Sequence, residues 1–527
     1  MFKNSPLTAR PVAVMEIGST GIRLLVAKIT GAGGWKELDR AGKPVALGRD
    51  VFTSGMVSRA SLLECLSILR NFKELLVGWD IAEHDVHLIA TSALRAAHNR
   101  DIFVDRVFQE TGYRLAIVEG VEENRLVYLA IRFALKNTTL RLPFFWSGSA
   151  MIIDIGGGST EIMLLRHGKM VAAHSIRVGT IVLDQHSRKV SGILLSRERY
   201  LIENFHNTIL FLQTEMPLDT VDAFVVTGSD TRIAASLIEQ DETNNDWCHT
   251  IERERFLTFI KEVKDYSIED CVQKLHITYG DAEGFVPGLL VYKYFLEQTK
   301  ASQVVVPVVS IREGLLVDIA MGVDPDLRED FFSQIIASAM NLGRKYHFDE
   351  AHGRQVALLS RVIFDFFSKE HGINRHERIL LEIAALLHDI GMFVKGSSHH
   401  KHGQYIIANS EIFGLRQEEL DIIGNIIRYH REDSPSSDDV AYIALQREER
   451  VLVLKMTSIL RVSDALDRGH AQQIKIKYIE RKNENAIFHL QGDVDTSLER
   501  IGLEEKAGMF EDVFGYKIVL APHPSGV

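Results

Sequence analysis

The sequence predicts an α/β protein of two lobes, followed by an all-helical region and a small C-terminal α+β region. Three observations predict this fold class. Strand-like and helix-like segments alternate up to about residue 320, which favours a layered α/β architecture. A unit of strand, glycine turn and strand occurs near residue 17 and again near residue 156. Long amphipathic helices replace the strands from about residue 328.

These changes of pattern divide the chain into four expected domains. The two lobes cover residues 1–136 and 137–322, the helical region covers 323–472, and the small region covers 473–527. The segment DPDLRED at 324–330 has the composition of a linker between the second lobe and the helices.

Composition limits the classes of function. The 527 residues include 60 basic and 71 acidic side chains, a net charge of −11, which argues against a general nucleic-acid binder. Only three cysteines are present, which fits a reducing compartment. Neither a signal peptide nor an apolar run of roughly 20 residues is present, so we expect a cytoplasmic protein with no membrane partner.

The first lobe opens with two apolar strands on either side of a glycine turn. A glycine-rich connection then leads to a helix that begins near Ser58, and the next strand ends in the polar residues TSALR. A further strand turns at Gly120 into a helix.

The second lobe repeats this opening. AMIIDIGGGSTEIMLL, at 150–165, places Asp154 where MEIGSTGIRLLV, at 15–26, has Glu16. DAFVVTGSDTRIAASL, at 222–237, predicts another strand that ends in a glycine turn and feeds a helix. The strand SQVVVPVVS and the expected turn IREGLL close the lobe near residue 316.

Glycine turns of this kind can bind anions. Consecutive backbone N–H groups form a concave site, and a carboxylate beside it makes chemical sense where a divalent cation bridges acid and phosphate. One such loop alone is more often a plain hairpin. Two matching loops, together with TGSD at 227–230, favour a phosphate site.

The motifs MEIGSTGIRLLV, ATSALRAAHN, VEGVEENRLVYL, DIGGGSTE, TGSDTRIAA and SIREGLL resemble, in this order, those of the exopolyphosphatase/guanosine pentaphosphate phosphohydrolase (Ppx/GppA) family. The resemblance covers residues 11–320. It implies two actin-like (ASKHA, ribonuclease H-like) lobes and release of terminal phosphate from polyphosphate or pppGpp, with water as the nucleophile. It also implies Mg²⁺ (or Mn²⁺) as cofactor and a homodimer.

The resemblance also assigns roles to residues. The residue that orients the water is Glu122, with Glu123 beside it, although acids are also favoured at the start of any helix. The phosphate-binding candidates are Gly18, Ser19, Arg23, Arg95, Gly157, Gly158, Ser159, Gly228 and Arg312. The metal candidates in the lobes are Asp154, Glu161 and Glu16.

Three segments depart from the family pattern. Glu16 stands where the family has Asp, and Thr20 and Gly21 replace an amide and a serine. The third loop has Ser229 and Asp230 in place of a glycine and a threonine, so we expect Asp230 to repel phosphate unless a metal is bound. A later Arg-Ala-Asp element appears here without its arginine, at 281–283.

The helical region carries a second set of candidate ligands. His352, the adjacent pair His388 and Asp389, and then Asp464 follow the ligand order of the HD phosphohydrolase family, and this resemblance implies a second divalent metal. Hydrogen-bonded core histidines are the alternative, and the region would then only bind the substrate or form a dimer interface. Further candidate ligands are His399, His400, His402 and His430.

The sequence therefore favours an exopolyphosphatase. The alternatives are a pppGpp 5′-phosphohydrolase, or a regulator that binds polyphosphate or pppGpp without turnover and has an HD-type phosphohydrolase activity.

Overall fold

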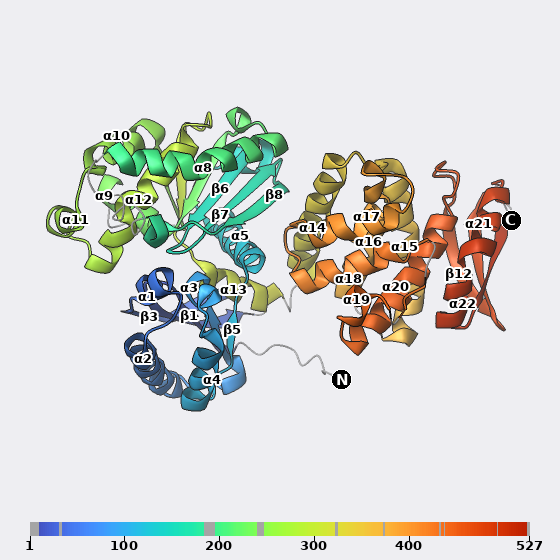
Figure 1. The fold of residues 1–527 in the computed structure, drawn as a ribbon, viewed down its shortest axis with the longest axis horizontal. Helices are drawn as coiled ribbons and strands as arrows, with labels where there is room; N and C mark the ends of the chain where they lie inside the picture. The colour runs from blue at the N-terminus through green and yellow to red at the C-terminus, as the bar shows by residue number, and fades with distance from the viewer. Residues whose placement is uncertain are drawn as a thin grey trace. The chain divides into compact units, whose positions relative to one another are not determined.

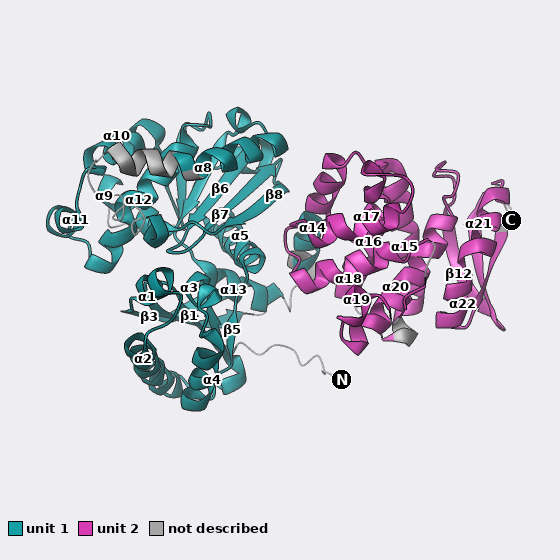
Figure 2. Cartoon of the chain, viewed as in Figure 1, with its two compact units in different colours: residues 1–334 teal, residues 335–527 magenta. Residues whose placement is uncertain are grey.

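The structure is a computed structural model that describes residues 10–30, 34–183, 195–239, 247–321, 325–372, 375–431, 434–436, 438–492 and 494–523. Figure 1 shows its ribbon, and Figure 2 colours its two compact units, residues 1–334 (unit 1) and 335–527 (unit 2). Within the described residues, every helix is too short or too polar to cross a membrane.

The first lobe of unit 1 is built on a five-stranded sheet of order β3-β2-β1-β4-β5. Its strands are β1 (Pro11–Ile17), β2 (Gly21–Thr30), β3 (Gly34–Pro44), β4 (Val86–Ala90) and β5 (Leu115–Ile117). Its helical segments are α1 (Leu47–Ser54), α2 (Arg59–Gly78), η1 (Glu83–Asp85), α3 (Ser92–Ala96), α4 (Arg100–Thr111) and α5 (Gly120–Asn137).

Local chemistry explains where these helices begin and end. The side chain of Ser58 accepts a hydrogen bond from the backbone N–H of Ser61, which caps α2 at the position that the sequence predicts. Gly55 follows α1 with a φ of 77°, a conformation that glycine adopts at little cost. The apolar strands β1 and β2 are buried over most of their length, as their composition predicts.

The second lobe is built on a six-stranded sheet of order β10-β11-β9-β6-β7-β8. Its strands are β6 (Ser149–Ile155), β7 (Thr160–Arg166), β8 (Lys169–Ile176), β9 (Ala223–Thr227), β10 (Cys248–Glu252) and β11 (Gln303–Pro307). Its helical segments are α6 (Pro143–Ser147), α8 (Leu195–Glu215), η2 (Leu218–Thr220), α9 (Ser229–Glu239), α10 (Arg253–Val263), α11 (Ile268–Leu275), α12 (Tyr279–Leu296) and α13 (Ile311–Met321).

The two sheets share one topology, which confirms the repeat predicted from the sequence. In each, three antiparallel strands are followed by two strands parallel to the first: β3-β2-β1-β4-β5 in one lobe and β8-β7-β6-β9-β11 in the other. The register also repeats, since Glu16 lies opposite Arg23 and Asp154 lies opposite Glu161. The acids that precede the two glycine turns therefore occupy equivalent places.

One strand was missed and two local predictions were wrong. The glycine-rich connection forms β3, because its central residues 34–44 pair with β2. IREGLL begins α13 and is not a turn, because Glu313 accepts hydrogen bonds from the backbone and side chain of Ser310, which precedes the helix. The expected linker at 324–330 is helical from residue 325 onward, where α14 (Pro325–Lys345) begins.

Unit 2 consists of helices followed by a three-stranded sheet of order β12-β13-β14. The helical segments after α14 are α15 (Glu350–His371), α16 (Arg375–Leu387), η3 (Ile390–Phe393), α17 (His399–Ala408), α18 (Gln417–Arg428), α19 (Val440–Ile443) and α20 (Arg447–Ala465). The last elements are β12 (Ile476–Lys482), β13 (Asn485–Gln491), α21 (Ser497–Lys506), α22 (Gly508–Phe514) and β14 (Lys517–His523). The tail thus has the small sheet that its apolar segments predict.

Candidate functional site

The two glycine turns of unit 1 meet face to face. A Cβ built on Gly157, in the β6–β7 turn, would lie 2.7 Å from the Cβ of Ser19 in the β1–β2 turn. Ser19 in turn lies within hydrogen-bonding distance of Ser92, with 3.2 Å between the hydroxyl oxygens. The paired loops therefore approach each other as closely as backbone allows, and glycine is required at this contact.

A polar cavity opens beside these loops. Of the predicted residues it is lined by Glu16, Gly18, Ser19, Arg23, Glu123, Asp154, Gly157, Gly228 and Arg312. Other polar residues on its wall are Thr20, Thr91, Ser92, Thr180, Ser229, Asp230, Arg232, Asp281 and Ser310. Five predicted residues lie outside this lining: Arg95, Glu122, Gly158, Ser159 and Glu161.

The structure distinguishes the two adjacent glutamates at the start of α5. Glu123 lines the cavity and is 8% exposed, whereas Glu122 accepts two hydrogen bonds of 2.7 Å from Arg125, which also binds Asp318. Neighbouring residues on a helix point about 100° apart, so only one of the two can face the cavity. Glu123, and not Glu122, is in position to contact a ligand there.

Arg95 holds Glu123 in place. Its guanidinium donates hydrogen bonds to the Glu123 carboxylate at 2.8 Å, to the carbonyl oxygen of Val118 at 2.7 Å and to the Ser159 hydroxyl at 3.4 Å. The guanidinium carries a positive charge, and hydrogen bonds from a charged donor to a carboxylate are stronger than those between neutral groups. This contact therefore fixes the orientation of the Glu123 carboxylate. Arg95 and Ser159 therefore support the cavity wall from behind. At Gly158 only glycine fits, because an added Cβ would collide with the ring of Phe52.

Several buried carboxyl groups gather at this wall. Burial raises the pKa of Glu123 to about 7, against the opposing effect of Arg95, and burial also raises the pKa of Asp154. Burial and the neighbouring charge of Glu123 raise the pKa of Glu161 well above its usual value, and the Glu161 Oε2 atom has no hydrogen-bond partner. Because like charges repel, each of these three carboxyl groups makes ionisation of the others less favourable. A cation bound among them would favour the ionised form of all three.

Three arginines face the same cavity. Arg23 and Arg312 were predicted, whereas sequence reasoning missed Arg232. Arg232 donates a hydrogen bond of 3.0 Å to the carbonyl oxygen of Val309, and burial lowers its pKa. Its position one helical turn after Gly228, at the start of α9, is the signal that could have identified it.

Glu16 has a partner of its own. Its carboxylate lies 3.2 Å from the Nε atom of Arg312, which is buried. The acid that stands where the family has Asp therefore neutralises a guanidinium as well as lining the cavity.

Asp230, the expected repulsive residue, lies on the wall at the start of α9. Burial, and then the charge of Asp281, raise the pKa of Asp230 to about 7. Its repulsion of phosphate is therefore weakened, because the carboxyl group is partly protonated near neutral pH.

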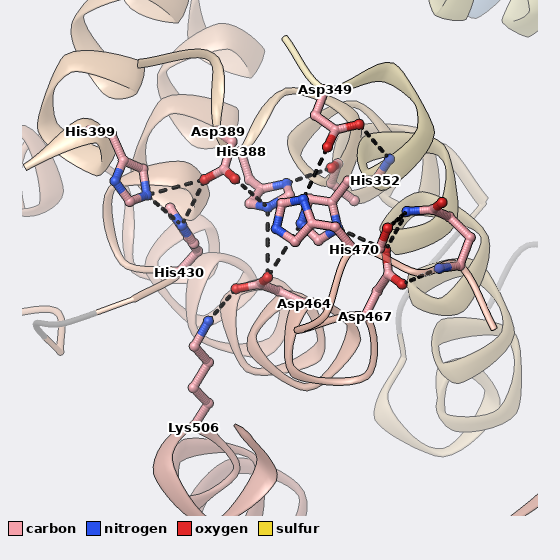
Figure 3. Close-up of polar contacts among 12 residues, drawn as sticks. Asp349, His352, His388, Asp389, His399, His430, Asp464, Asp467, His470 and Lys506 are labelled. Carbon is pink, nitrogen blue, oxygen red and sulfur yellow. Dashed lines mark hydrogen bonds and ion pairs between the residues drawn. The ribbon is translucent and has the colours of Figure 1, made fainter. Parts of the chain in front are cut away.

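In unit 2 the four predicted ligands come together (Figure 3). His352 on α15 and His388 after α16 place their Nε2 atoms 3.6 and 3.8 Å from Oδ1 of Asp464 on α20. Asp389 places its Oδ2 atom 3.6 Å from the His388 Nε2 atom. Three groups of potential metal ligands among the described residues include them: His352–His388–Asp464, His388–Asp389–His430 and His352–Asp389–His470.

Two family models match most of the chain. A model of the Ppx/GppA phosphatase family matches residues 25–322, and a model of Ppx/GppA phosphatase domain III matches residues 336–507. The chain belongs to the Ppx/GppA phosphatase family. Members of this family are phosphoanhydride hydrolases, a chemistry that the polar cavity of unit 1 suits.

Relatives of this Ppx/GppA protein include two curated enzymes named guanosine-5′-triphosphate,3′-diphosphate pyrophosphatase. The one from Pseudoalteromonas atlantica is 23% identical over 457 residues, which are 86% of this chain and 85% of the relative. The one from Vibrio atlanticus is 23% identical over 454 residues, which are 85% and 86% of the two chains.

A solved structure has the same fold as part of this Ppx/GppA protein. The exopolyphosphatase from Cytophaga hutchinsonii superposes with a TM-score of 0.53 at 17% identity and covers 60% of this chain and 99% of its own. The likeness supports the mixed α/β fold with actin-like sheets that the motifs imply.

Proposed function

We propose that this protein is an exopolyphosphatase that releases terminal orthophosphate from inorganic polyphosphate by metal-assisted attack of water. The observation that carries the proposal is the composition of the cavity wall in unit 1. Among the described residues that line it are glycine turns, hydroxyls, arginines and Glu123, and none is aromatic. A phosphate chain presents only oxygens, whereas a purine base is commonly bound by stacking on an aromatic ring.

In this proposal, Glu123 is the general base. Its carboxylate accepts a proton from a water molecule as the water oxygen bonds to the terminal phosphorus. The bond from that phosphorus to the bridging oxygen breaks, and the shortened chain leaves with the charge on that oxygen. Arg95 keeps the carboxylate oriented, since it binds Glu123 at 2.8 Å. Positioning and charge stabilisation account for most of the catalysis in phosphoryl transfer.

The remaining wall residues would bind the phosphate chain. Backbone N–H groups at Gly157 and Gly228 would contact phosphate oxygens, as at other glycine turns. The N–H of Gly18 already donates to the carbonyl oxygen of Gly21 at 2.9 Å, so Gly18 would shape the turn and leave phosphate binding to its neighbours. Arg232 and Arg312 would neutralise the phosphates, and their burial strengthens this attraction. The negative charge of the substrate would in turn offset the repulsion between the guanidinium groups of these arginines.

The residues beside the turns fit a divalent cation. Asp154 and Glu123 line the cavity, and the unpartnered Glu161 Oε2 atom lies in the same group of coupled carboxyls. Oxygen ligands of this kind suit Mg²⁺ or Mn²⁺. Bound there, the cation would supply charge neutralisation on the reacting phosphate. Glu16 is a weaker candidate ligand, because Arg312 already neutralises it.

The adjacent glutamates provide a matched test. Glu123→Gln is expected to lower the rate of phosphate release from polyphosphate with Mg²⁺ by roughly 10²- to 10⁴-fold, the usual contribution of a general base. Glu122→Gln, which alters only the contact with Arg125, is expected to retain most of the rate. Equal loss in both variants, or full activity in Glu123→Gln, would disprove this role.

A second candidate function is hydrolysis of the 5′-terminal phosphate of pppGpp. The curated relatives named above favour it, because they align with 86% and 85% of this chain. Phosphate release measured from polyphosphate and from pppGpp at equal concentrations of terminal phosphate would rank the two substrates. A higher kcat/KM for pppGpp would replace the first proposal with the second.

The third reading is a regulator that binds these substrates without turnover and uses unit 2 as an HD-type phosphohydrolase. It predicts tight binding of polyphosphate but no phosphate release that depends on Glu123. Release abolished by Asp389→Ala but not by Glu123→Gln would favour it. The expected homodimer is tested by measuring the mass of the protein in solution.

A further inference from the structure

The phenol of Tyr292 lies behind the wall of the unit 1 cavity and joins two of its loops. Tyr292 belongs to α12, and its side chain is fully buried outside the described residues that line the cavity. Its hydroxyl donates a hydrogen bond of 2.5 Å to the carbonyl oxygen of Thr227, at the end of β9. The same hydroxyl accepts a hydrogen bond of 3.3 Å from the backbone N–H of Ile155, at the end of β6. One side chain thus connects the two strand ends beside Asp154 and Gly228.

This bridge lies where the two strands separate. β6 and β9 pair in parallel, and the last pair in their register is Asp154 with Thr227. Beyond this pair the chain of β6 turns into β7, and the chain of β9 leads into α9. The Tyr292 hydroxyl, placed between the N–H of Ile155 and the carbonyl of Thr227, continues the hydrogen bonding across the gap. Ligands of α/β sheets bind outside the carboxyl ends of parallel strands, so the bridge supports the ligand-binding end of the sheet.

Thr227 links the phenol to Asp154. Tyr292 holds the backbone carbonyl of Thr227, and the Thr227 side-chain hydroxyl donates a hydrogen bond of 2.5 Å to Oδ1 of Asp154. Asp154 lines the cavity and is a candidate ligand of the divalent cation. Partners of this kind orient a metal-binding carboxylate, and their loss commonly weakens metal binding or activity by roughly 10- to 100-fold.

The phenol also lies against the third glycine turn. A Cβ built on Gly228 would be 3.2 Å from the Tyr292 hydroxyl oxygen and 3.3 Å from the carbonyl oxygen of Ile155. Gly228 has a φ of 132°, a conformation that residues with side chains rarely adopt. The turn therefore packs on the hydroxyl, which fixes the distance between the Gly228 N–H and Asp154.

A tyrosine suits this position because its hydroxyl both donates and accepts. Burial raises the pKa of Tyr292 well above its usual value, so the phenol keeps its proton and donates to Thr227 near neutral pH. Phenylalanine would fill the same space but would remove this partner from the N–H of Ile155 and the carbonyl of Thr227. Loss of a partner is unfavourable for buried backbone groups, so the two strand ends are expected to shift.

We propose that Tyr292 is a positioning residue for phosphate release: acting through Thr227, it sets the spacing between the carboxylate of Asp154 and the turn at Gly228. The cation and the phosphate must meet at one place, so the groups that bind them have to be held at a fixed separation. The proposal rests on the phosphate-release function proposed above, and it concerns a residue that touches neither the substrate nor the cation.

Tyr292→Phe in the full chain tests this role. The variant is expected to raise the Mg²⁺ concentration that half-saturates phosphate release from polyphosphate by roughly tenfold or more. It should also lower kcat more than it changes KM for polyphosphate, since the arginines that bind the chain are untouched. Tyr294→Phe is the matched control, because Tyr294 lies two residues further along α12, about 200° round the helix. An equal Mg²⁺ requirement in the two variants would overturn the proposal.

A second variant separates positioning from a loss of packing. Thr227→Val removes the hydroxyl that contacts Asp154 but leaves the carbonyl that Tyr292 holds. If the phenol acts through Thr227, the double variant raises the Mg²⁺ requirement no further than the larger of the single changes, because coupled residues are not additive. Effects that multiply in the double variant would contradict this route. Should Tyr292→Phe not fold, a wild-type Mg²⁺ requirement in Thr227→Val would overturn the proposal by itself.

Equilibrium binding makes the test independent of turnover. Tripolyphosphate is titrated calorimetrically into each protein in the presence of a chelator, which reports on the turn at Gly228 without metal or hydrolysis. Tyr292→Phe, checked for folding by circular dichroism, is expected to bind roughly tenfold more weakly than the wild type and Tyr294→Phe, the usual effect of a misaligned hydrogen bond to a charged group. Unchanged binding would overturn the role of Tyr292. A wild type that binds but releases no phosphate would refute the proposed function alone, because the binding comparison still decides the role of Tyr292.

Discussion

At the scale of single residues, the chemistry of unit 1 depends on which side chain of a neighbouring pair faces the cavity. Glu123 does so and Glu122 does not, although both follow the same family motif. Arg232 shows the reverse case, since it lies within the motif TGSDTRIAA without having been singled out, yet it lines the cavity. A motif thus locates a site to within a helical turn, and the packing of the helix selects the residue.

Asp230 leads to a prediction about pH and stability. Burial raises its pKa from 3.8 to about 7, so between these pH values the folded state binds more protons than the unfolded state. The free energy of unfolding therefore falls as pH rises through this window. Asp230→Asn should remove that loss and raise the melting temperature of the metal-free protein by a few degrees at pH 8, but not near pH 4.

Thermal unfolding followed by circular dichroism at pH 4 and pH 8 measures this difference. Asp219→Asn, at an exposed aspartate of the same lobe, is the control and should change little at either pH. A stabilisation by Asp230→Asn that is equal at both pH values would contradict the assignment to ionisation.

At the scale of elements, two hairpins with glycine turns touch each other where the lobes meet. The turn of β6–β7 touches the turn of β1–β2 so closely that a single methyl group on Gly157 would lie 2.7 Å from Ser19. Gly156, its neighbour, has room for a methyl group, since the nearest atom to an added Cβ, the Ser159 carbonyl oxygen, lies at an ordinary contact distance of 3.6 Å. The hairpins therefore tolerate side chains at one glycine but not at the next.

This difference predicts opposite outcomes for two alanine variants. Gly157→Ala should separate the turns and lower phosphate release by at least roughly tenfold, because misplacement of reacting groups by about 1 Å costs much of the rate. Gly156→Ala should retain activity within roughly twofold. Steady-state phosphate release, with circular dichroism as the folding control, compares them. Similar activity in both would show that the loop contact is not required.

At the scale of the whole molecule, the chain carries two separate centres of different chemistry. The cavity of unit 1 combines oxygen ligands with arginines, whereas the unit 2 cluster combines imidazoles with two aspartates. The two compact units have their own cores, so each is expected to unfold as a cooperative block.

Calorimetry should therefore resolve two unfolding transitions. Mn²⁺ stabilises the state that binds it, so addition of Mn²⁺ to the metal-free protein should raise the transition of unit 2 by several degrees. Asp389→Asn should remove this shift in unit 2, and Glu123→Gln should preserve it. A shift that survives in Asp389→Asn would place the stabilising ion elsewhere.

Much of the fold followed from local sequence patterns. The repeated hairpins, the helix after Ser58 and the strands of the tail all lie where apolar periodicity and glycine turns predict them. The failures were local too. β3 was missed because its strand character comes from pairing with β2, which its glycine-rich composition does not show. The IREGLL helix was missed because its start depends on the Ser310–Glu313 contact.

The sequence by itself determined the α/β repeat, the order of the motifs and the family, because these depend on residue type and spacing along the chain. The tertiary structure alone decided which atoms meet. It placed Glu123 at the cavity, paired Glu16 with Arg312, and brought His399 and His430 to the second oxygen of Asp389. These contacts join residues from different elements, and their geometry is set by how helices and sheets pack.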